Sequence, residues 1–370
     1  MTPARPAPRR AIVLGGGGVL GFAWILGALS ALEAVAGFDV RDVDIAVGTS
    51  AGSVAAGLLG CGVPLDAICR HHQGMPAPAD PPIAYDYAGA TGGALPPRPG
   101  LWPGSPRLLL GGLRHPLRLS PIVTLAGLLP TGRGTLAPVH DLMAGVASEA
   151  GFAERWPARP RPWVVAADYH VGRRIVFGRD NFASRAAIRS ADGVHQRSAA
   201  DVVTVPRIIR RASLADAVTA SCSIPAWYPP TVIDGVPYID GGTLSNASVD
   251  VLQGTGVGEV YVLAPMASVE TDRARTPIGR VERLVRRAIT RGILADVAAL
   301  RATGMRVYLV TPEPADLAVI GLNLMNPARR TEVFETAQGT AAGQLARQLS
   351  SSAGRAAARV AGDLPGQTPA

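Results

Sequence analysis

The pentapeptide Gly48-Thr49-Ser50-Ala51-Gly52 places a serine where its hydroxyl can act as a nucleophile. Residues 45–47 before it are apolar without alternation and predict a short buried strand, and the small residues 53–59 after it favour a helix. The flanking glycines permit a sharp turn from strand to helix, which leaves the serine oxygen clear of the backbone above the helix N-terminus. The pattern is typical of a nucleophilic serine, and an inactive glycine-rich turn is the alternative.

A serine hydroxyl attacks an ester only when a base takes its proton. The chain has six histidines: His71, His72, His115, His140, His170 and His195. None lies near the C-terminus, where an α/β-hydrolase places its catalytic histidine. His195, beside Asp192, lies in a polar segment with no predicted strand leading into it, so we interpret all six histidines as surface or core residues.

Asp240 is a better candidate for the base. The apolar pair Tyr238-Ile239 predicts a short strand, and Gly241-Gly242 permits an immediate turn that leaves the carboxylate at the strand end. Partial desolvation would raise the pKa of this carboxylate, and a hydrogen bond to Ser50 would let it act as the base of a two-residue dyad. For this residue alone, a turn without chemistry, as at Asp234-Gly235, is the alternative.

A glycine-rich stretch near the N-terminus supplies a third element. Residues 11–14 are apolar and predict a buried strand, Gly15-Gly16-Gly17-Gly18 predicts a turn, and a helix is expected at about residues 20–36. The first amides of a helix have no intrahelical partner and attract an anion. A pyrophosphate, as in the dinucleotide pattern Gly16-x-Gly18-x-x-Gly21, and the oxyanion of an acyl-transfer intermediate would both suit this turn. A P-loop is excluded, because no Gly-Lys-Ser/Thr follows.

Taken together and in this order, the three motifs resemble those of the patatin-like phospholipase family. Members carry a glycine-rich oxyanion loop near the N-terminus, a G-x-S-x-G pentapeptide in the next strand–turn–helix unit, and a distal D-G-G or D-G-A. The matching stretches here are residues 16–21, residues 48–52 and Asp240-Gly241-Gly242. Residues 220–230 also look like the family's approach to its aspartate, so the resemblance spans about residues 12–264.

This resemblance implies a Ser–Asp dyad, with Ser50 as the nucleophile and Asp240 as the proton acceptor. It also implies an oxyanion hole made by backbone N–H groups, here those of Gly16, Gly17, Gly18 and Ala51. The remaining motif glycines are Gly21, Gly48, Gly52, Gly241 and Gly242. The loop departs from the family at Leu20, where many members carry arginine or lysine, and this puts the activity or the headgroup preference in question. No metal or cofactor is implied.

The order of the predicted elements indicates an α/β fold with a mainly parallel central sheet and helices on both faces, the three-layer arrangement that the resemblance also implies. Further strands are expected at residues 163–167, 174–177, 259–264 and 305–310, and further helices at 138–150, 213–220 and 278–303. We divide the chain into a disordered tail at residues 1–10, a catalytic domain at 11–311 and a C-terminal extension at 312–370, which is helical at first and disordered beyond about residue 349.

Two stretches are interpreted with an alternative. Residues 74–134 form a proline- and glycine-rich insertion with apolar patches, which we interpret as a lid or acyl-chain groove over the site, with a partly ordered surface excursion as the alternative. The helix at 278–303 is amphipathic. Its apolar positions are Val281, Leu284, Val285 and Ala288, and its arginines are Arg280, Arg283, Arg287 and Arg291. We interpret the arginine face as solvated, with docking on anionic lipid as the alternative.

Composition bounds the partners and the compartment. The 370 residues are 48% hydrophobic and 17% charged, which excludes wholesale disorder. The net charge is +8 and every basic side chain is arginine, so anionic lipid or nucleic acid would be attracted. Aromatic residues are only 5% and do not alternate with arginine, which disfavours nucleic acid. The three cysteines, Cys61, Cys69 and Cys222, lack metal-site spacing and predict free thiols in the cytoplasm.

The N-terminal residues imitate an export signal, with Arg9-Arg10 ahead of the apolar residues 11–29. Glycines interrupt this apolar run, and removing it would delete the glycine loop, so we interpret it as mature structure. No uninterrupted apolar run reaches the length of a membrane span, about 18 residues. Any membrane contact is therefore expected to be peripheral.

We expect a serine lipid acyl hydrolase, similar to phospholipase A or lysophospholipase, that cleaves fatty-acyl esters through an acyl-enzyme. One alternative is a Rossmann-type dinucleotide-binding protein, in which Asp39, Asp42 or Asp44 holds the ribose. A catalytically silent lipid-binding protein on the same fold, suggested by Leu20, is the other.

Overall fold

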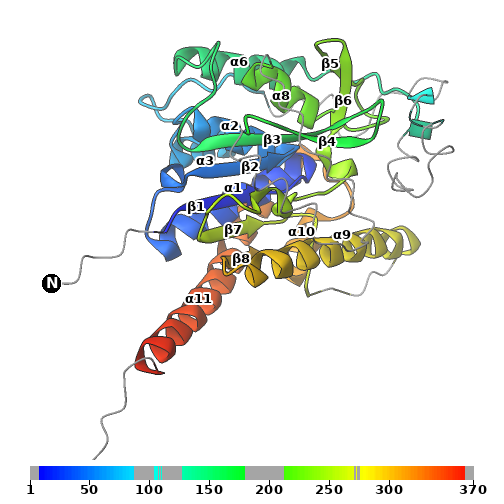
Figure 1. The fold of residues 1–370 in the computed structure, drawn as a ribbon. Helices are drawn as coiled ribbons and strands as arrows, with labels where there is room; N and C mark the ends of the chain where they lie inside the picture. The colour runs from blue at the N-terminus through cyan, green and yellow to red at the C-terminus, as the bar shows by residue number, and fades with distance from the viewer. Residues whose placement is uncertain are drawn as a thin grey trace, which may run out of the picture.

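The computed structural model describes residues 8–86, 104–106, 108, 110, 127–179, 212–270, 272 and 276–362, with side chains as far as Ser351. These residues build an eight-stranded sheet in the order β5-β6-β3-β2-β1-β7-β8, with β4 paired to β3 (Figure 1). The strands are β1 (Arg10–Leu14), β2 (Ile45–Thr49), β3 (Arg161–Asp168), β4 (Arg173–Phe177), β5 (Thr231–Ile233), β6 (Val236–Asp240), β7 (Glu259–Leu263) and β8 (Arg306–Val310).

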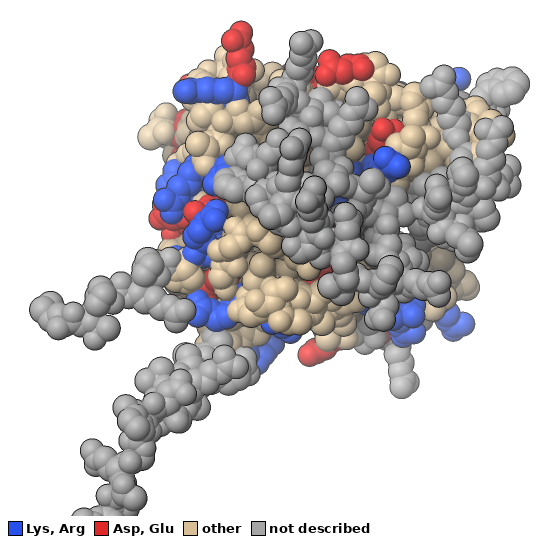
Figure 2. All heavy atoms as spheres, in the orientation of Figure 1, with Lys and Arg blue, Asp and Glu red and all other residues tan. Residues whose placement is uncertain are grey.

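Helices connect and cover these strands. The α-helices are α1 (Gly18–Ala36), α2 (Ala51–Gly60), α3 (Leu65–Gln73), α6 (Ala137–Glu149), α8 (Leu214–Ser221), α9 (Pro277–Ala302), α10 (Pro314–Ile320) and α11 (Arg330–Gly362). Short 3₁₀ turns are η1 (Val40–Asp42), η2 (Gly241–Thr243), η3 (Val249–Leu252) and η4 (Pro327–Arg329). Basic and acidic side chains are both spread over the face seen in Figure 2, so the positive net charge is not gathered in one patch there.

Five neighbouring strands, β3, β2, β1, β7 and β8, run parallel, whereas β4, β5 and β6 are antiparallel to their partners. Parallel strands end at one edge of the sheet, which we call the carboxyl edge, and begin at the other, the amino edge. Leu14 pairs with Gly48 and with Leu263, so the segments after β1, β2 and β7 start level with one another. The carboxyl edge is therefore where the glycine loop and the Ser50 turn meet.

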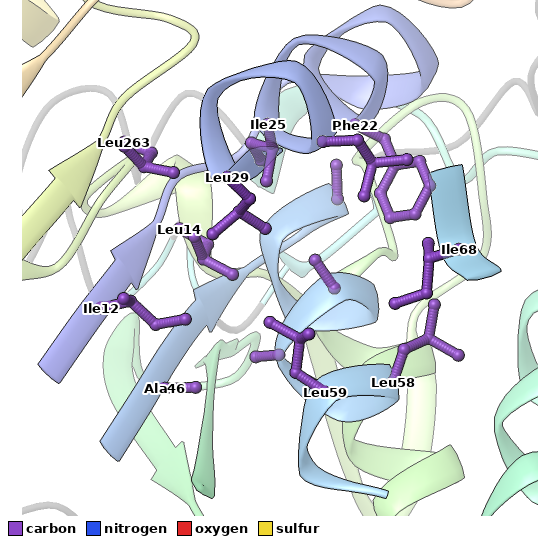
Figure 3. Close-up of a cluster of buried hydrophobic side chains, with 14 of the residues drawn as sticks. Ile12, Leu14, Phe22, Ile25, Leu29, Ala46, Leu58, Leu59, Ile68 and Leu263 are labelled. Carbon is purple, nitrogen blue, oxygen red and sulfur yellow. The ribbon is translucent and has the colours of Figure 1, made fainter. Parts of the chain in front are cut away.

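Each face of the sheet carries its own apolar core, because alternate residues of a strand point to opposite faces. One face packs against α1, α2, α3, α6, α8 and α11, and Figure 3 shows Ile12, Leu14 and Ala46 of the strands directed at side chains of α1 and α2. The other face, with Val13, Val47 and Val165, packs against η3 and the C-terminal half of α9. The expected α/β fold with helices on both faces is confirmed, and the strands expected at residues 163–167 and 174–177 form the antiparallel pair β3–β4.

Within the described chain, α1 is the helix whose length and apolar composition would allow it to cross a membrane. It lies in the core, with 67% of its apolar window buried, between the sheet and α11. The two helices approach closely, since a Cβ built on Gly27 would lie 2.3 Å from the carbonyl oxygen of Phe334. A helix buried on both sides is as apolar as a membrane span, and composition alone does not separate the two.

The ends of the chain differ from the expectation in two places. Disorder is expected beyond about residue 349, whereas α11 continues to Gly362; its buried side chains, between Val333 and Leu345, pack against α1. At the other end Arg10 already belongs to β1, and its guanidinium donates to Glu259 at 2.9 Å. Residues 1–7 and most of the insertion at 74–134 lie outside the described residues.

Candidate active site

Ser50 lies in the turn between β2 and α2 with φ 52° and ψ −125°, a conformation that residues other than glycine rarely adopt. Two neighbouring hydroxyls hold this turn. Ser221 Oγ accepts the Ser50 N–H at 2.8 Å, and Ser53 Oγ donates to the Ser50 carbonyl at 2.6 Å. Because α2 begins at Ala51, the Ser50 side chain stands at the N-terminus of that helix.

Two glycines of the pentapeptide are required by the space around them. A Cβ on Gly52 would lie 2.1 Å from the Leu14 carbonyl oxygen, and one on Gly48 would lie 2.4 Å from that of Gly52. The first turn of α2 thus packs directly against the end of β1. This packing brings Ser50 beside the glycine loop, where a Cβ on Gly16 would lie 3.2 Å from Ser50 Cβ.

Asp240 lies next to Ser50 because β2 and β6 both pair with β3. Thr49, the last residue of β2, is opposite Val165, and Asp240, the last residue of β6, is opposite Ala166. The serine follows β2 immediately, so the two side chains lie at adjacent positions on either side of β3. Motifs far apart in the sequence therefore meet at the carboxyl edge.

Among the other motif glycines, Gly241 has no space for a side chain, whereas Gly21 does. A Cβ on Gly241 would lie 2.5 Å from the Val165 carbonyl oxygen, so only glycine lets η2 turn this close to β3. A Cβ on Gly21 would lie 3.5 Å from Pro265, which is an ordinary contact.

The Asp240 carboxylate is buried, and Oδ1 accepts the Gly242 N–H at 2.7 Å. Burial raises the pKa of Asp240 to about 6, while hydrogen bonds with the Ser50 side chain and the Gly242 amide act in the opposite direction. The carboxylate is therefore ionised at neutral pH but holds a proton far more readily than an exposed aspartate. Such a group can take a proton from a neighbouring hydroxyl and return it.

The amides around Ser50 divide into paired and unpaired donors. Gly16 N–H donates to the Asn246 carbonyl at 3.0 Å. Among the residues that the structure describes, the N–H groups of Gly17, Gly18 and Ala51 have no acceptor. Gly16 was expected in the oxyanion hole, and its amide is instead engaged in holding the loop, so three of the four expected donors are free for an anion.

Two residues of the site have no role in the sequence-based prediction. Ser221, which accepts the Ser50 N–H, also donates to the Val165 carbonyl at 2.6 Å and so ties the Ser50 turn to β3. The backbone of Asn246 fixes the glycine loop. Ser221 lies in the stretch 220–230 that resembles the family, but the resemblance assigns no role to Ser221 or Asn246, because both act through long-range contacts.

An apolar cavity, partly open to solvent, begins at Ser50. Its lining side chains are almost all aliphatic or aromatic and come from α1, α2, α3, α6 and the segments around residues 84, 224 and 325. They are Gly18, Val19, Phe22, Ser50, Ala51, Val54, Leu58, Ile68, Ile83, Tyr85, Leu136, Val139, Leu142, Cys222, Ile224, Tyr228 and Met325. A hydroxyl beside free amides at the mouth of such a cavity suits a substrate with a polar carbonyl and an apolar chain.

The ends of the predicted insertion contribute to this cavity. Ile83 and Tyr85 line it just after the insertion begins, and Leu136 lines it just after the insertion ends. The segment between them, residues 87–103 and 111–126, lies outside the described residues. The expectation of an acyl-chain groove thus stays a prediction for that part of the chain.

The acids that a bound ribose would need lie at the wrong edge of the sheet. Asp44 precedes β2, and its carboxylate accepts the Arg10 N–H at 3.0 Å at the start of β1. Asp39 pairs with Arg41 at the same edge. Because β1 separates these acids from the glycine loop by roughly 15 Å, one dinucleotide cannot use both in the Rossmann manner.

None of the histidines that the structure describes lines the cavity at Ser50. His72 is buried in the core between Phe22 and Phe334, and burial lowers its pKa to about 4. His140 is a half-exposed residue of α6 whose ring nitrogens lie 3.4 Å from Asp141 and 3.5 Å from Asp216. His115, Asp192 and His195 lie outside the described residues. Within the described ranges, no group of three or more His, Cys, Asp or Glu side chains is arranged to hold a metal ion, and the three cysteines are free and buried.

Comparison with known proteins gives a family and a set of similar folds. The model of the family described as patatin-like phospholipase matches residues 12–75 and 109–252. A search of curated proteins gave no significant match. Among solved structures, VipD from Legionella pneumophila is similar over 94% of this chain and 72% of its own, with 12% identity and a TM-score of 0.39. The type III effector protein ExoU is similar over 93% of this chain and 54% of its own, with 17% identity and a TM-score of 0.30.

Proposed function

This chain belongs to the patatin-like phospholipase family, and from that premise we propose that it is a serine lipid acyl hydrolase with a Ser50–Asp240 dyad. The observation that carries the proposal is the position of Ser50. Its hydroxyl lies beside a buried carboxylate and beside free amides, at the mouth of an apolar cavity. Ester hydrolysis by a serine needs a base, donors for the oxyanion and a site for the acyl chain, and these three features would supply them.

In the proposed reaction Asp240 takes the proton of the Ser50 hydroxyl as the oxygen attacks the acyl carbonyl carbon. The negative charge that develops on the carbonyl oxygen is stabilised by the N–H groups of Gly17, Gly18 and Ala51. Asp240 then gives its proton to the leaving alcohol, and an acyl-enzyme ester remains on Ser50. Asp240 next deprotonates a water molecule, whose attack releases the fatty acid and restores the serine.

The cavity indicates the substrate class. Its lining would accept an acyl chain along Val54, Leu58 and Leu142, with the ester carbonyl held at Ser50. We propose fatty-acyl esters of phospholipid or lysophospholipid as substrates, together with peripheral contact with an anionic membrane, the surface from which such substrates come.

The structure offers no reason to treat Leu20 as a mark of lost activity. Its side chain is fully buried in the first turn of α1, and its N–H donates to the Leu324 carbonyl at 2.9 Å. Leu20 does not line the cavity. The side chain therefore stabilises the helix that carries the glycine loop, and the oxyanion donors proposed here are backbone groups that do not depend on it.

The test is covalent labelling together with turnover. We expect a fluorophosphonate to label Ser50, and hydrolysis of a soluble short-chain ester to fall at least about a thousandfold in Ser50→Ala and in Asp240→Asn. Ser351→Ala and Asp234→Asn are the matched controls, because these two residues are exposed and lie outside the site. Unchanged turnover in Ser50→Ala would contradict the proposal.

A further inference from the structure

The N-terminal half of α9 presents its apolar side chains to solvent, which is the reverse of the arrangement that an amphipathic helix usually takes on a folded protein. Its exposed apolar residues are Ile278 (71% exposed), Val281 (61%), Leu284 (60%) and Val285 (52%). Arg283 and Arg286 are buried instead, at 8% and 1% exposure. The interpretation of the arginine face as wholly solvated is therefore wrong for Arg283.

The buried arginines are paired, which explains how the helix can lie this way round. Arg286 donates to the carbonyl oxygens of Pro265 and Ala267 at 2.7 and 3.2 Å, and its Nε donates to Glu282 at 2.9 Å. Arg283 pairs with Asp272, with Nη2 to Oδ2 at 2.9 Å. These contacts fix the rotation of α9 and leave the apolar stripe without a partner among the described residues.

The stripe lies at the same edge of the sheet as Ser50. The helix α9 ends beside the start of β8, where Arg301 donates to the Val307 carbonyl, so it runs from the carboxyl edge back to the amino edge. Arg286 is anchored at Pro265, the residue that faces Gly17 of the glycine loop. The nine residues of α9 before Arg286 thus extend roughly 13 Å beyond this anchor on the active-site side.

Other exposed apolar side chains follow the same edge. Val171, Val269 and Leu322 are exposed in the segments that follow β3, β7 and β8. At the amino edge, none of the described turns carries a large exposed hydrophobic side chain; these turns are residues 37–44, 61–64, 151–160, 253–258 and 303–305. Among the described loops, the large exposed hydrophobic side chains thus lie at the carboxyl edge rather than at the amino edge.

Charge decides between the possible occupants of this surface. The exposed face of the N-terminal half of α9 also carries Arg280, Arg287 and Arg291, which lie along one flank of the apolar stripe. The acid in this half of α9, Glu282, is half-buried and paired with Arg283 and Arg286, and in the neighbouring segment Asp272 is paired with Arg283 whereas Glu270 is exposed. Basic side chains are visible at the lower right of Figure 2, at the end of α9 drawn in Figure 1.

We propose that residues 278–291 of α9 dock on an anionic lipid bilayer, with the apolar stripe in the interface and the arginines at the headgroups. Exposed apolar residues next to arginines on one helix face are the composition of an interfacial helix. Docking in this way turns the carboxyl edge toward the membrane, so the mouth of the cavity faces the source of acyl chains. Only this orientation of the site rests on the proposed function; the binding itself does not.

The test measures binding in the full-length Ser50→Ala protein, so that turnover cannot alter the vesicles. Sedimentation with phosphatidylcholine vesicles that contain phosphatidylglycerol should pull down the protein, and pure phosphatidylcholine or high salt should weaken this binding. We expect Leu284→Ser to weaken binding about tenfold and Arg287→Gln about fivefold. Leu294→Ser on the same helix and Arg306→Gln at the amino edge are the matched controls, for which binding should be retained.

The outcomes separate this inference from the proposed function. Hydrolysis of a soluble short-chain ester should be unchanged in Leu284→Ser, since Leu284 does not line the cavity. Equal vesicle binding in Leu284→Ser and Leu294→Ser would overturn the docking proposal and leave the hydrolase proposal intact. Failure to bind vesicles, together with a dimer in light scattering that Leu284→Ser dissociates, would assign the stripe to a second copy of the chain and also overturn it.

Discussion

Burial of the Asp240 carboxylate favours proton transfer from Ser50 but lowers the stability of the folded protein at neutral pH. A base that faces a serine gains from a raised pKa, because it binds the transferred proton more strongly. The same burial makes the ionised form costly in the folded protein. Both consequences are measurable, and both follow from one group at the end of β6.

The raised pKa of Asp240 predicts how turnover depends on pH. Burial raises the pKa of Asp240 to about 6, so the carboxyl group is protonated below that pH and cannot take the proton of Ser50. We expect kcat/KM for a soluble ester to rise with pH through about 6 and then level off. A profile that stays flat through this range would show that another group is the base.

The raised pKa of Asp240 also predicts how the free energy of unfolding depends on pH. The pKa of Asp240 is raised on folding, so the protein loses stability as pH rises from the ordinary value of 3.8 through about 6. Asparagine cannot ionise. Asp240→Asn should therefore raise the free energy of unfolding by up to about 3 kcal/mol at pH values above about 6, and leave it unchanged at pH values below 3.8. Urea unfolding below pH 3.8 and above pH 6 measures this difference in the free energy of unfolding, with Asp234→Asn as the exposed control. A gain in the free energy of unfolding of Asp240→Asn at acid pH alone would contradict a raised pKa at Asp240.

At the scale of elements, the junction between β1, β2 and α2 depends on glycine for space. Gly52→Ala would place a methyl group 2.1 Å from the Leu14 carbonyl oxygen, and α2 would have to move away from β1. We expect a loss of at least about 3 kcal/mol in the free energy of unfolding, with loss of ester turnover. Gly145→Ala, at an exposed position of α6 with no atom within 4 Å, should instead gain about 0.5–1 kcal/mol.

The elements of the parallel core are predictable from the sequence because their signals are local. The apolar runs at residues 11–14 and 259–264 and the glycines after β1 and β2 specify strands and turns without reference to the rest of the chain. The family resemblance then brings Ser50 and Asp240 into one candidate site.

What the sequence does not specify is set by distant contacts. The spacing of Val281 and Leu284 predicts an amphipathic helix, but not which face the fold covers. That choice depends on Arg286, whose partners at Pro265 and Ala267 lie in another segment. The role of Ser221 likewise depends on its position between Ser50 and β3.

At the scale of the whole molecule, α1 is enclosed between the sheet and α11. The described side chains of α11 that are buried lie between Val333 and Leu345, against α1. The segment that leads into α11 also supports the glycine loop, because the Leu324 carbonyl accepts the Leu20 N–H and Met325 lies against Gly18. The C-terminal helix and the candidate oxyanion hole are thus parts of one packed unit.

This coupling predicts the effect of a single methyl group far from the dyad. Gly27→Ala would place a Cβ 2.3 Å from the Phe334 carbonyl oxygen and force α11 away from α1. We expect the free energy of unfolding to fall by about 2 kcal/mol or more, and ester turnover to fall with it as the loop loses the support of residues 324–325. Gly339→Ala, at an exposed position of α11 with no atom within 4 Å, is the matched control and should keep its turnover and gain about 0.5–1 kcal/mol in the free energy of unfolding. Full turnover in a destabilised Gly27→Ala protein would show that the loop holds its amides in place without α11.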